Sequence, residues 1–221
     1  MSVELTGVEP SVQHDDEAGS PLVLLTTRGE VPCIFHSPVR SVGLGVVWSA
    51  GARGGVEGPS NGIYRELAVT LAQRNIASLR VDYRHPSNLD ESVLDVLVGV
   101  WHMAAIGYSR VALVGHSFGG GVVLSASRYS THVRAVAALS SQTMGAEDVV
   151  LLNHRPLLVV HGEADAVLPL TNAETIYGWA PQPKRLVTFP GAGHGLRECA
   201  DELRLLLSEW IDEVLMPFTI A

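Results

Sequence analysis

The sequence has few charged residues, few aromatic residues and almost no cysteine. Of 221 residues, 17% are charged, 6% are aromatic and 2 are cysteines. Cys33 and Cys199 lie far apart and form no Cys-x-x-Cys motif, so neither a disulfide framework nor a zinc site is indicated. His-Glu-x-x-His and clustered Cys/His ligands are also missing. We therefore expect no metal and no cofactor, and a reducing, cytoplasmic setting.

Positive charge is also scarce. The chain has 15 Lys and Arg against 23 Asp and Glu, a formal net charge of −8, and its basic residues are scattered along the sequence. Without a basic stripe, neither nucleic acid nor an anionic membrane surface is an expected partner. No apolar run reaches about 18 residues free of charge, so no membrane-spanning helix is predicted.

The beginning of the chain lacks the pattern of a secretory signal. It has no basic start followed by an apolar run, and it contains the polar stretch His14-Asp15-Asp16-Glu17. We predict a polar, mobile segment over residues 1–20. Because 47% of all residues are hydrophobic, the rest should form a compact globule, and we assign residues 21–221 to a single domain.

Apolar runs of strand length alternate with segments of helical period. The first two, 22–27 and 31–35, flank Arg28-Gly29-Glu30 and predict an antiparallel hairpin. Further strands are predicted at 44–49, 76–81, 111–115, 133–139, 157–161 and 186–189. Helices are predicted between them, at 63–71, 89–100, 118–128, 171–179 and 197–215. This order predicts the α/β class, with a mostly parallel sheet covered by helices on both faces.

Two of the predicted helices carry start signals. Ser60 or Asn61 is available to cap the first, and Asn88 precedes the second. Glu91 stands three residues after Asn88, as in a capping box.

Residues 111–121, Val-Ala-Leu-Val-Gly-His-Ser-Phe-Gly-Gly-Gly, lead from a buried strand through Gly-x-Ser-x-Gly into a helix. This is the context of a nucleophile elbow, in which a sharp turn exposes Ser117 at the end of the strand. Gly115 and Gly119 leave room for the turn. The Phe118 amide and the positive end of the helix face a developing oxyanion.

A serine nucleophile needs a base, and His194 is the candidate. It follows the last predicted strand in the loop Pro190-Gly-Ala-Gly-His-Gly195, at the edge of the sheet where Ser117 is expected. An ordinary surface histidine is the alternative. His161 and His116 are interpreted as packing residues, the first at a strand end and the second beside the nucleophile.

The acid that orients the histidine should follow the preceding strand. Asp165, in Gly162-Glu-Ala-Asp-Ala-Val-Leu-Pro169, fits this position and gives the chain order serine, acid, histidine. Glu163 is a local competitor, although it follows the strand end at once and should point elsewhere. Asp148 is a more distant competitor and is interpreted as a solvated charge.

Segments 115–119, 162–169 and 190–195 resemble the α/β-hydrolase superfamily, as does the order of elements from Leu44 onward. The small size and the sequence Leu79-Arg-Val-Asp-Tyr-Arg84 resemble lidless carboxylesterases and dienelactone-hydrolase-like proteins. Dienelactone hydrolases proper use a cysteine nucleophile, where this chain has Ser117, so their substrate does not carry over.

The resemblance implies a second oxyanion donor after the strand at 44–49. Relatives commonly carry His-Gly there, and aligning Gly51 with that glycine makes the Ala52 amide the donor, with the register open by one residue. Arg53 either faces solvent, which we favour, or recognises an acidic substrate group. Asp82 and Arg84 are predicted to form an ion pair.

The predicted function is hydrolysis of small carboxylic esters through Ser117, His194 and Asp165, with a small-molecule ester as the partner. A thioesterase or small peptidase would use the same residues, and a ligand-binding homologue without turnover is a further alternative. Between Leu139 and Leu157, where relatives insert lids, the connection has room for only one short helix. An open cleft is expected.

Overall fold

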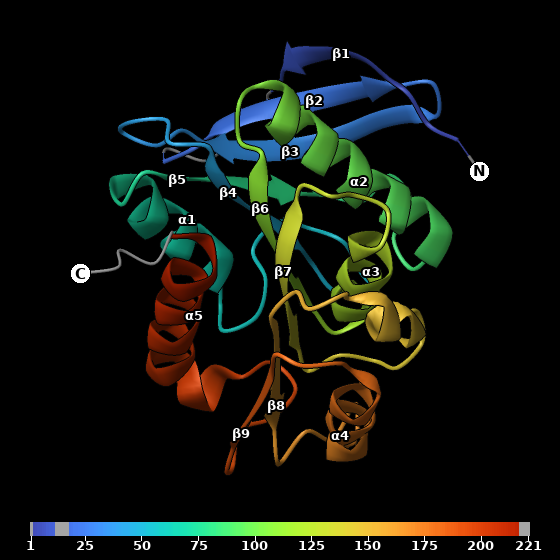
Figure 1. The fold of residues 1–221 in the computed structure, drawn as a ribbon, viewed down its shortest axis with the longest axis vertical. Coiled ribbons are helices and arrows are strands. Elements are labelled where there is room, and N and C mark those ends of the chain that lie inside the picture. Colours follow the sequence, from blue (N-terminus) through green and yellow to red (C-terminus); the bar gives the residue numbers. More distant parts are fainter. Residues whose placement is uncertain (1, 12–17, 217–221) are drawn as a thin grey trace.

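The computed structural model describes residues 2–11 and 18–216, and its strands form one twisted sheet (Figure 1). The strand order is β1-β2-β3-β5-β4-β6-β7-β8-β9. The strands are β1 Leu5–Pro10, β2 Ser20–Thr26, β3 Gly29–His36, β4 Leu44–Ser49, β5 Ile76–Val81, β6 Arg110–His116, β7 Val133–Leu139, β8 Leu157–Gly162 and β9 Lys184–Phe189. From β5 to β9 in this order, neighbouring strands are parallel, which confirms the predicted fold class.

The N-terminal end of the sheet is antiparallel. β2 and β3 form the predicted hairpin, and β3 joins β5. The prediction of a mobile start was wrong for Leu5–Pro10, which pair with β2 as an edge strand. Most of its side chains are exposed and only Leu5 and Val8 are apolar, so the sequence carries little strand signal. Residues 14–17, also assigned to that segment, lie outside the described residues.

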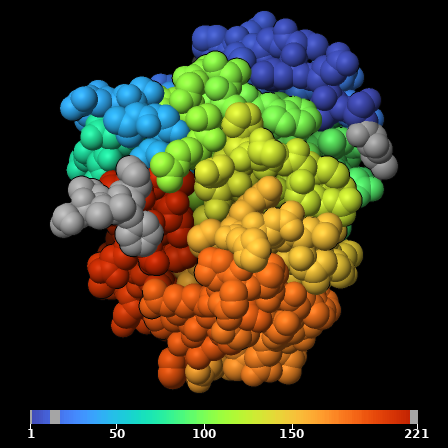
Figure 2. All heavy atoms as spheres, in the orientation of Figure 1, coloured from blue at the N-terminus to red at the C-terminus, as the bar shows by residue number. Residues whose placement is uncertain are grey.

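Helices cover both faces of the sheet, and each face has its own apolar core (Figure 1). α1 and α5 lie on one face, and α2, α3 and α4 lie on the other. The helices are α1 Ile63–Gln73, α2 Leu89–Ala105, α3 Phe118–Ser127, α4 Leu170–Trp179 and α5 Ala200–Leu215, with short 3-10 turns η1 Glu147–Leu151 and η2 Arg197–Cys199. In the space-filling view the N-terminal strands form one end of the molecule, and segments after β8 form the other (Figure 2).

One of the two predicted helix caps is correct. The Asn88 side chain accepts a hydrogen bond from the Glu91 amide at 3.2 Å. The predicted cap of α1 by Ser60 or Asn61 was wrong, because Gly62 with φ 110° precedes the helix and no side chain caps it. Ser60 instead donates to the Leu196 carbonyl at 2.6 Å and so ties this loop to the one after His194.

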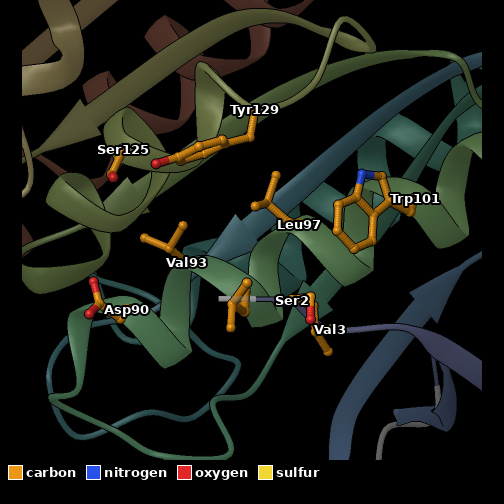
Figure 3. Close-up of a pocket in the computed structure, with 9 residues that line it drawn as sticks. Ser2, Val3, Asp90, Val93, Leu97, Trp101, Ser125 and Tyr129 are labelled. Carbon is orange, nitrogen blue, oxygen red and sulfur yellow. The ribbon is translucent and has the colours of Figure 1, made fainter. Parts of the chain in front are cut away.

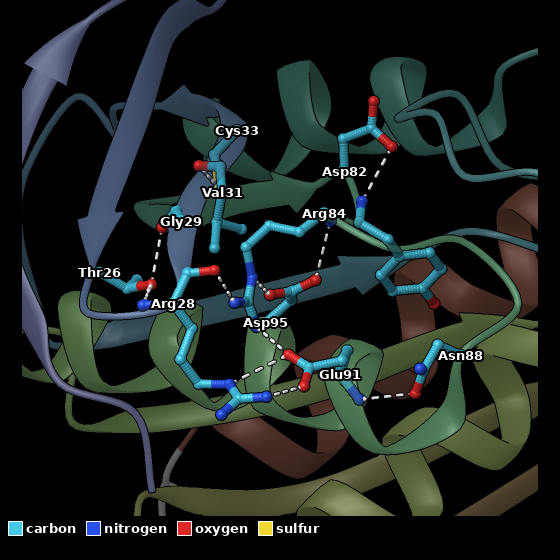
Figure 4. A network of polar contacts seen from close by, with 11 residues as sticks. Thr26, Arg28, Gly29, Val31, Cys33, Asp82, Arg84, Asn88, Glu91 and Asp95 are labelled. Atoms are coloured by element: carbon cyan, nitrogen blue, oxygen red, sulfur yellow. Dashed lines mark hydrogen bonds and ion pairs between the residues drawn. The ribbon is translucent and has the colours of Figure 1, made fainter.

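A partly buried ion-pair network attaches the β2–β3 turn to α2 (Figure 4). The predicted Asp82–Arg84 pair was wrong: Arg84 forms ion pairs with Asp95 and Glu91. Arg28, in the turn, also pairs with Glu91. Burial raises the pKa of Asp95, although Arg84 opposes this effect. The Arg84 side chain therefore turns toward α2, while Asp82 accepts hydrogen bonds from backbone amides of Gly55 and Tyr83.

The buried contact between Arg80 and His36 predicts acid sensitivity. Arg80 Nε donates to His36 Nε2 at 3.1 Å, so the imidazole must be neutral there. Burial, reinforced by Arg65 and opposed by the Ala18 carbonyl, lowers the pKa of His36 from 6.5 to about 4. On acidification His36 binds a proton near pH 6.5 in the unfolded chain but only near pH 4 in the folded protein. The contribution of neutral His36 to the free energy of unfolding is therefore complete above pH 6.5 and is lost as the pH falls toward 4.

We expect His36 to contribute up to about 3 kcal/mol to this loss. In His36→Gln the amide oxygen can still accept from Arg80 but does not titrate, so its unfolding free energy should depend less on pH. Urea unfolding at several pH values between 6.5 and 4 measures how the free energy of unfolding changes with pH. His132→Gln, at a histidine on the surface, is the control. Equal slopes for wild type and His36→Gln would contradict the assignment.

Candidate active site

The candidate nucleophile lies in the sharp turn between β6 and α3. Ser117 has φ 58° and ψ −118°, a strained conformation for a residue with a side chain. A Cβ on Gly115 would lie 2.1 Å from the Gly119 carbonyl oxygen, and one on Gly119 would lie 2.2 Å from the Ala50 carbonyl oxygen. Only glycine fits at both positions. The turn therefore has the geometry of the predicted elbow and presents Ser117 at the C-terminal end of β6.

The structure brings Ser117, His194 and Asp165 together in one hydrogen-bonded chain. His194 Nε2 lies 3.0 Å from Ser117 Oγ, and His194 Nδ1 lies 2.8 Å from Asp165 Oδ2. The Asp165 side chain is fully buried, whereas that of His194 is 19% exposed. With a carboxylate at Nδ1, that nitrogen carries the proton and Nε2 is left free to accept one from the serine.

Backbone amides hold the Asp165 carboxylate in its ionised form. Its Oδ1 accepts hydrogen bonds from the amides of Val167 at 2.8 Å and Leu168 at 2.9 Å. Burial alone would raise the pKa of Asp165, but these amides and the His194 ring outweigh burial and lower it. The carboxylate is therefore ionised at neutral pH and available to His194.

Two further histidines support the loops of the site, as the sequence analysis expected of packing residues. His161 Nε2 lies 3.0 Å from the Leu168 carbonyl oxygen and 3.4 Å from Asp165 Oδ2. His116 Nε2 lies 2.9 Å from the His194 carbonyl oxygen, and burial lowers the pKa of His116 to about 4. A neutral His116 that donates to this carbonyl fixes the backbone of the loop that carries His194.

The competing acids lie elsewhere. Glu163 Oε1 accepts a hydrogen bond from the Thr188 hydroxyl at 2.7 Å. Asp148 pairs with Arg128 and accepts from Ser125. Neither carboxylate contacts His194 in the described structure, so Asp165 is the acid that the geometry supports.

Phe118 and the loop after β4 flank Ser117. As the first residue of α3, Phe118 has an amide with no acceptor within the helix. Across the cleft, a Cβ on Gly51 would lie 3.8 Å from Ser117 Cβ, and Ala52 lines the same cleft. Phe118 thus follows the nucleophile directly, and Ala52 lines the cleft into which Ser117 opens.

Side chains that the sequence analysis did not assign to the site hold this loop in place. The Tyr83 hydroxyl donates to the Ala50 carbonyl oxygen at 2.9 Å, and its ring packs edge-on against Phe118 with centroids 5.8 Å apart. Asp82 Oδ1 accepts from the Gly55 amide at 2.6 Å, and the Ser87 hydroxyl donates to the Ala52 carbonyl oxygen at 2.7 Å. The strand end at Asp82-Tyr83 thus positions the predicted oxyanion loop.

The residues around Ser117 line an open cleft of about 780 Å³. Its walls come from segments 51–62 and 193–198, together with Val167. Arg53 is exposed and lines the mouth. The connection between β7 and β8 contains only η1, whose Val149 is buried, and none of residues 140–156 lines the cleft.

A second cavity of about 540 Å³ shares no lining residue with this cleft (Figure 3). Apolar side chains of α2, among them Val93, Leu97 and Trp101, line it together with Val3 and Tyr129. It therefore lies apart from the serine, histidine and aspartate. Within residues 2–11 and 18–216 no helix combines the length and apolar character needed to cross a membrane, and no three acidic, His or Cys side chains are grouped to hold a metal ion.

The sheet order and the elbow define an α/β hydrolase. The model of the dienelactone hydrolase family matches residues 70–205, more than half of the chain. This chain therefore belongs to the dienelactone hydrolase family.

Individual relatives are distant. The uncharacterized protein YfhR of Escherichia coli O157:H7 is 28% identical over 161 residues, 58% of this chain and 56% of YfhR. The chain thus spans little more than half the length of this relative. A dienelactone hydrolase from Anabaena variabilis superposes with a TM-score of 0.75 at 18% identity, covering 90% of this chain and 100% of that one. A serine hydrolase without a lid from Xanthomonas campestris gives 0.71 at 17% identity, covering 92% and 98%. These two likenesses concern the fold.

Proposed function

We propose that this protein is a serine hydrolase that cleaves small carboxylic esters. The observation that carries the proposal is the hydrogen-bonded chain from the buried Asp165 through His194 to Ser117. Membership of a hydrolase family supports the same class of reaction. Each residue has one role: Ser117 is the nucleophile, His194 is the general base and acid, and Asp165 orients the histidine.

The reaction proceeds through an acyl-enzyme. His194 Nε2 takes the proton of Ser117 as its oxygen attacks the ester carbonyl carbon, and Asp165 stabilises the imidazolium that forms. The tetrahedral intermediate then collapses: the C–O bond to the alcohol breaks, and the alcohol leaves with the proton from His194. A water molecule, deprotonated by His194, attacks the acyl carbon and releases the carboxylic acid and Ser117.

The oxyanion of each tetrahedral intermediate is stabilised by the amides of Phe118 and Ala52. Phe118 supplies its amide from the first turn of α3, where the helix dipole adds positive potential. Ala52 belongs to the loop that Tyr83 and Asp82 hold against the elbow. Each such donor contributes about 3 kcal/mol to transition-state stabilisation.

A substrate panel tests this proposal. Purified protein is assayed with matched acetyl esters, thioesters and anilides, and kcat/KM is compared. We expect the oxygen ester to be hydrolysed fastest. A clear preference for the thioester or the amide would replace the proposed activity with that of a thioesterase or peptidase, and no turnover of any of them would favour a ligand-binding protein.

The shape of the cleft predicts a preference for short acyl groups. Among the described lining residues, only Ala52, Pro59 and Val167 offer apolar side chains, and no lid covers them. A long acyl chain would remain largely in water, and each methylene left unburied forgoes about 0.8 kcal/mol. We expect kcat/KM to be higher for acetyl to hexanoyl esters than for dodecanoyl or palmitoyl esters.

A series of p-nitrophenyl esters below their aggregation limits measures this preference. The rate should show no jump when the substrate forms an interface. A preference for the palmitoyl ester, or interfacial activation, would mean that a lid or tunnel covers the cleft.

A further inference from the structure

The fold gathers one third of the basic residues at the edge of the sheet opposite Ser117. Arg110 begins β6, Arg134 is the second residue of β7, Arg155 lies just before β8, and Lys184 and Arg185 begin β9. These strands are neighbours and run parallel, so their N-terminal ends lie at the same edge. They are 5 of the 15 Lys and Arg of a chain with net charge −8.

Little negative charge balances this edge. In the described part of the chain none of the five cations forms an ion pair with a carboxylate. Arg155 donates to the Ser127 carbonyl, and Lys184 donates to the Tyr177 carbonyl at 2.6 Å. Burial, together with the charge of Arg134, lowers the pKa of Arg155. The Arg110 Nε is buried without a hydrogen-bond partner among the described residues.

Two adjoining cavities open among these cations. One, of about 480 Å³, is lined by Arg110, Arg134 and Arg155. The other, of about 620 Å³, is lined by Arg110, Lys184 and Arg185 together with the apolar side chains of Trp210 and Val214. Arg110, Pro156 and Val214 line both, so the two cavities adjoin. Of the described residues around them, Glu213 alone is acidic.

We propose that this edge is a binding site for a small molecule that carries a multiply charged oxyanionic group, phosphate or carboxylate, next to an apolar portion. Guanidinium groups bind such oxyanions through paired, charge-assisted hydrogen bonds. Trp210 and Val214 offer an apolar wall beside them. The concave shape fits a small molecule, and the net negative charge of the protein repels an extended polyanion such as nucleic acid.

Titration calorimetry with pyrophosphate and with citrate, at ionic strength held constant with sodium chloride, tests this site in the full-length protein. We expect saturable binding of one anion per protein. The double variant R134Q/R185Q removes one exposed cation from each cavity and should weaken binding by at least about 10-fold. R128Q/R204Q removes two cations that pair with acids elsewhere, and its affinity should equal that of wild type.

The two anions distinguish the sources of charge. Tighter binding of pyrophosphate identifies phosphate as the ligand group, and tighter binding of citrate identifies carboxylate. The proposal is overturned if neither anion binds saturably, if both double variants weaken binding equally, or if R134Q/R185Q binds as wild type does. Unchanged circular dichroism excludes misfolding as the cause of a loss. Because this measurement needs no turnover, its outcome is independent of the proposed hydrolase activity.

Discussion

Replacing Ser117 or His194 with alanine is expected to lower kcat for a short ester by about 10⁴- to 10⁶-fold. Ser117→Ala removes the attacking oxygen, and His194→Ala removes the base that lies 3.0 Å from it. Because the two residues act in the same step, the double variant should be scarcely slower than either single variant. Hydrolysis of p-nitrophenyl acetate at saturating substrate measures the three rates, and circular dichroism verifies the fold.

His132→Ala is the matched control, because this histidine hydrogen-bonds to the Ser109 carbonyl and does not line the cleft. Its kcat should equal that of wild type. If His194→Ala kept near-normal turnover, the general base would be assigned wrongly, and His161 would be the next candidate. A double variant whose kcat fell by the product of the two single fold-losses would also contradict the view that both residues act in the same step.

Asp165→Asn is expected to lower kcat by about 10⁴-fold while the fold is retained. The asparagine oxygen can still accept from the amides of Val167 and Leu168, which turns its NH₂ group toward His194. An NH₂ donor at Nδ1 forces the proton of a neutral imidazole onto Nε2. In that tautomer His194 cannot accept the proton of Ser117.

Glu163→Gln is the control for this substitution, since Glu163 contacts Thr188 rather than His194. Its kcat/KM should remain at the wild-type level. In a Ser117→Ala background, Asp165→Asn should cause no further loss. The acid would be reassigned if Glu163→Gln lost activity and Asp165→Asn kept it.

Much of this arrangement is predictable from sequence because it depends on local pattern and on one topological rule. The elbow is encoded by a buried strand, Gly-x-Ser-x-Gly and a helix start, all within residues 111–121. Parallel strands place their C-terminal ends at one edge, so the loops after β8 and β9 were predicted to bring Asp165 and His194 near Ser117. The distances from His194 to Ser117 and Asp165 in the structure agree with that placement.

The features that sequence did not predict depend on partners far away in the chain. β1 is ordered by pairing with β2, and its own residues carry little strand signal. The loop at Ala52 is held by Tyr83 and Asp82. The amino-acid sequence of neither segment indicates that the two are in contact. The basic edge arises in the same way, because strand starts that are scattered in sequence become neighbours in the sheet.

The central claim is that Ser117 is an activated nucleophile, and covalent labelling with a fluorophosphonate tests it most directly. Intact-protein mass spectrometry at neutral pH should show one phosphonyl group per chain, and peptide mapping should place it on Ser117. Ser117→Ala should remain unlabelled, and His194→Ala should react far more slowly than wild type. A wild-type protein that resists the reagent, or a label that persists in Ser117→Ala, would contradict the claim.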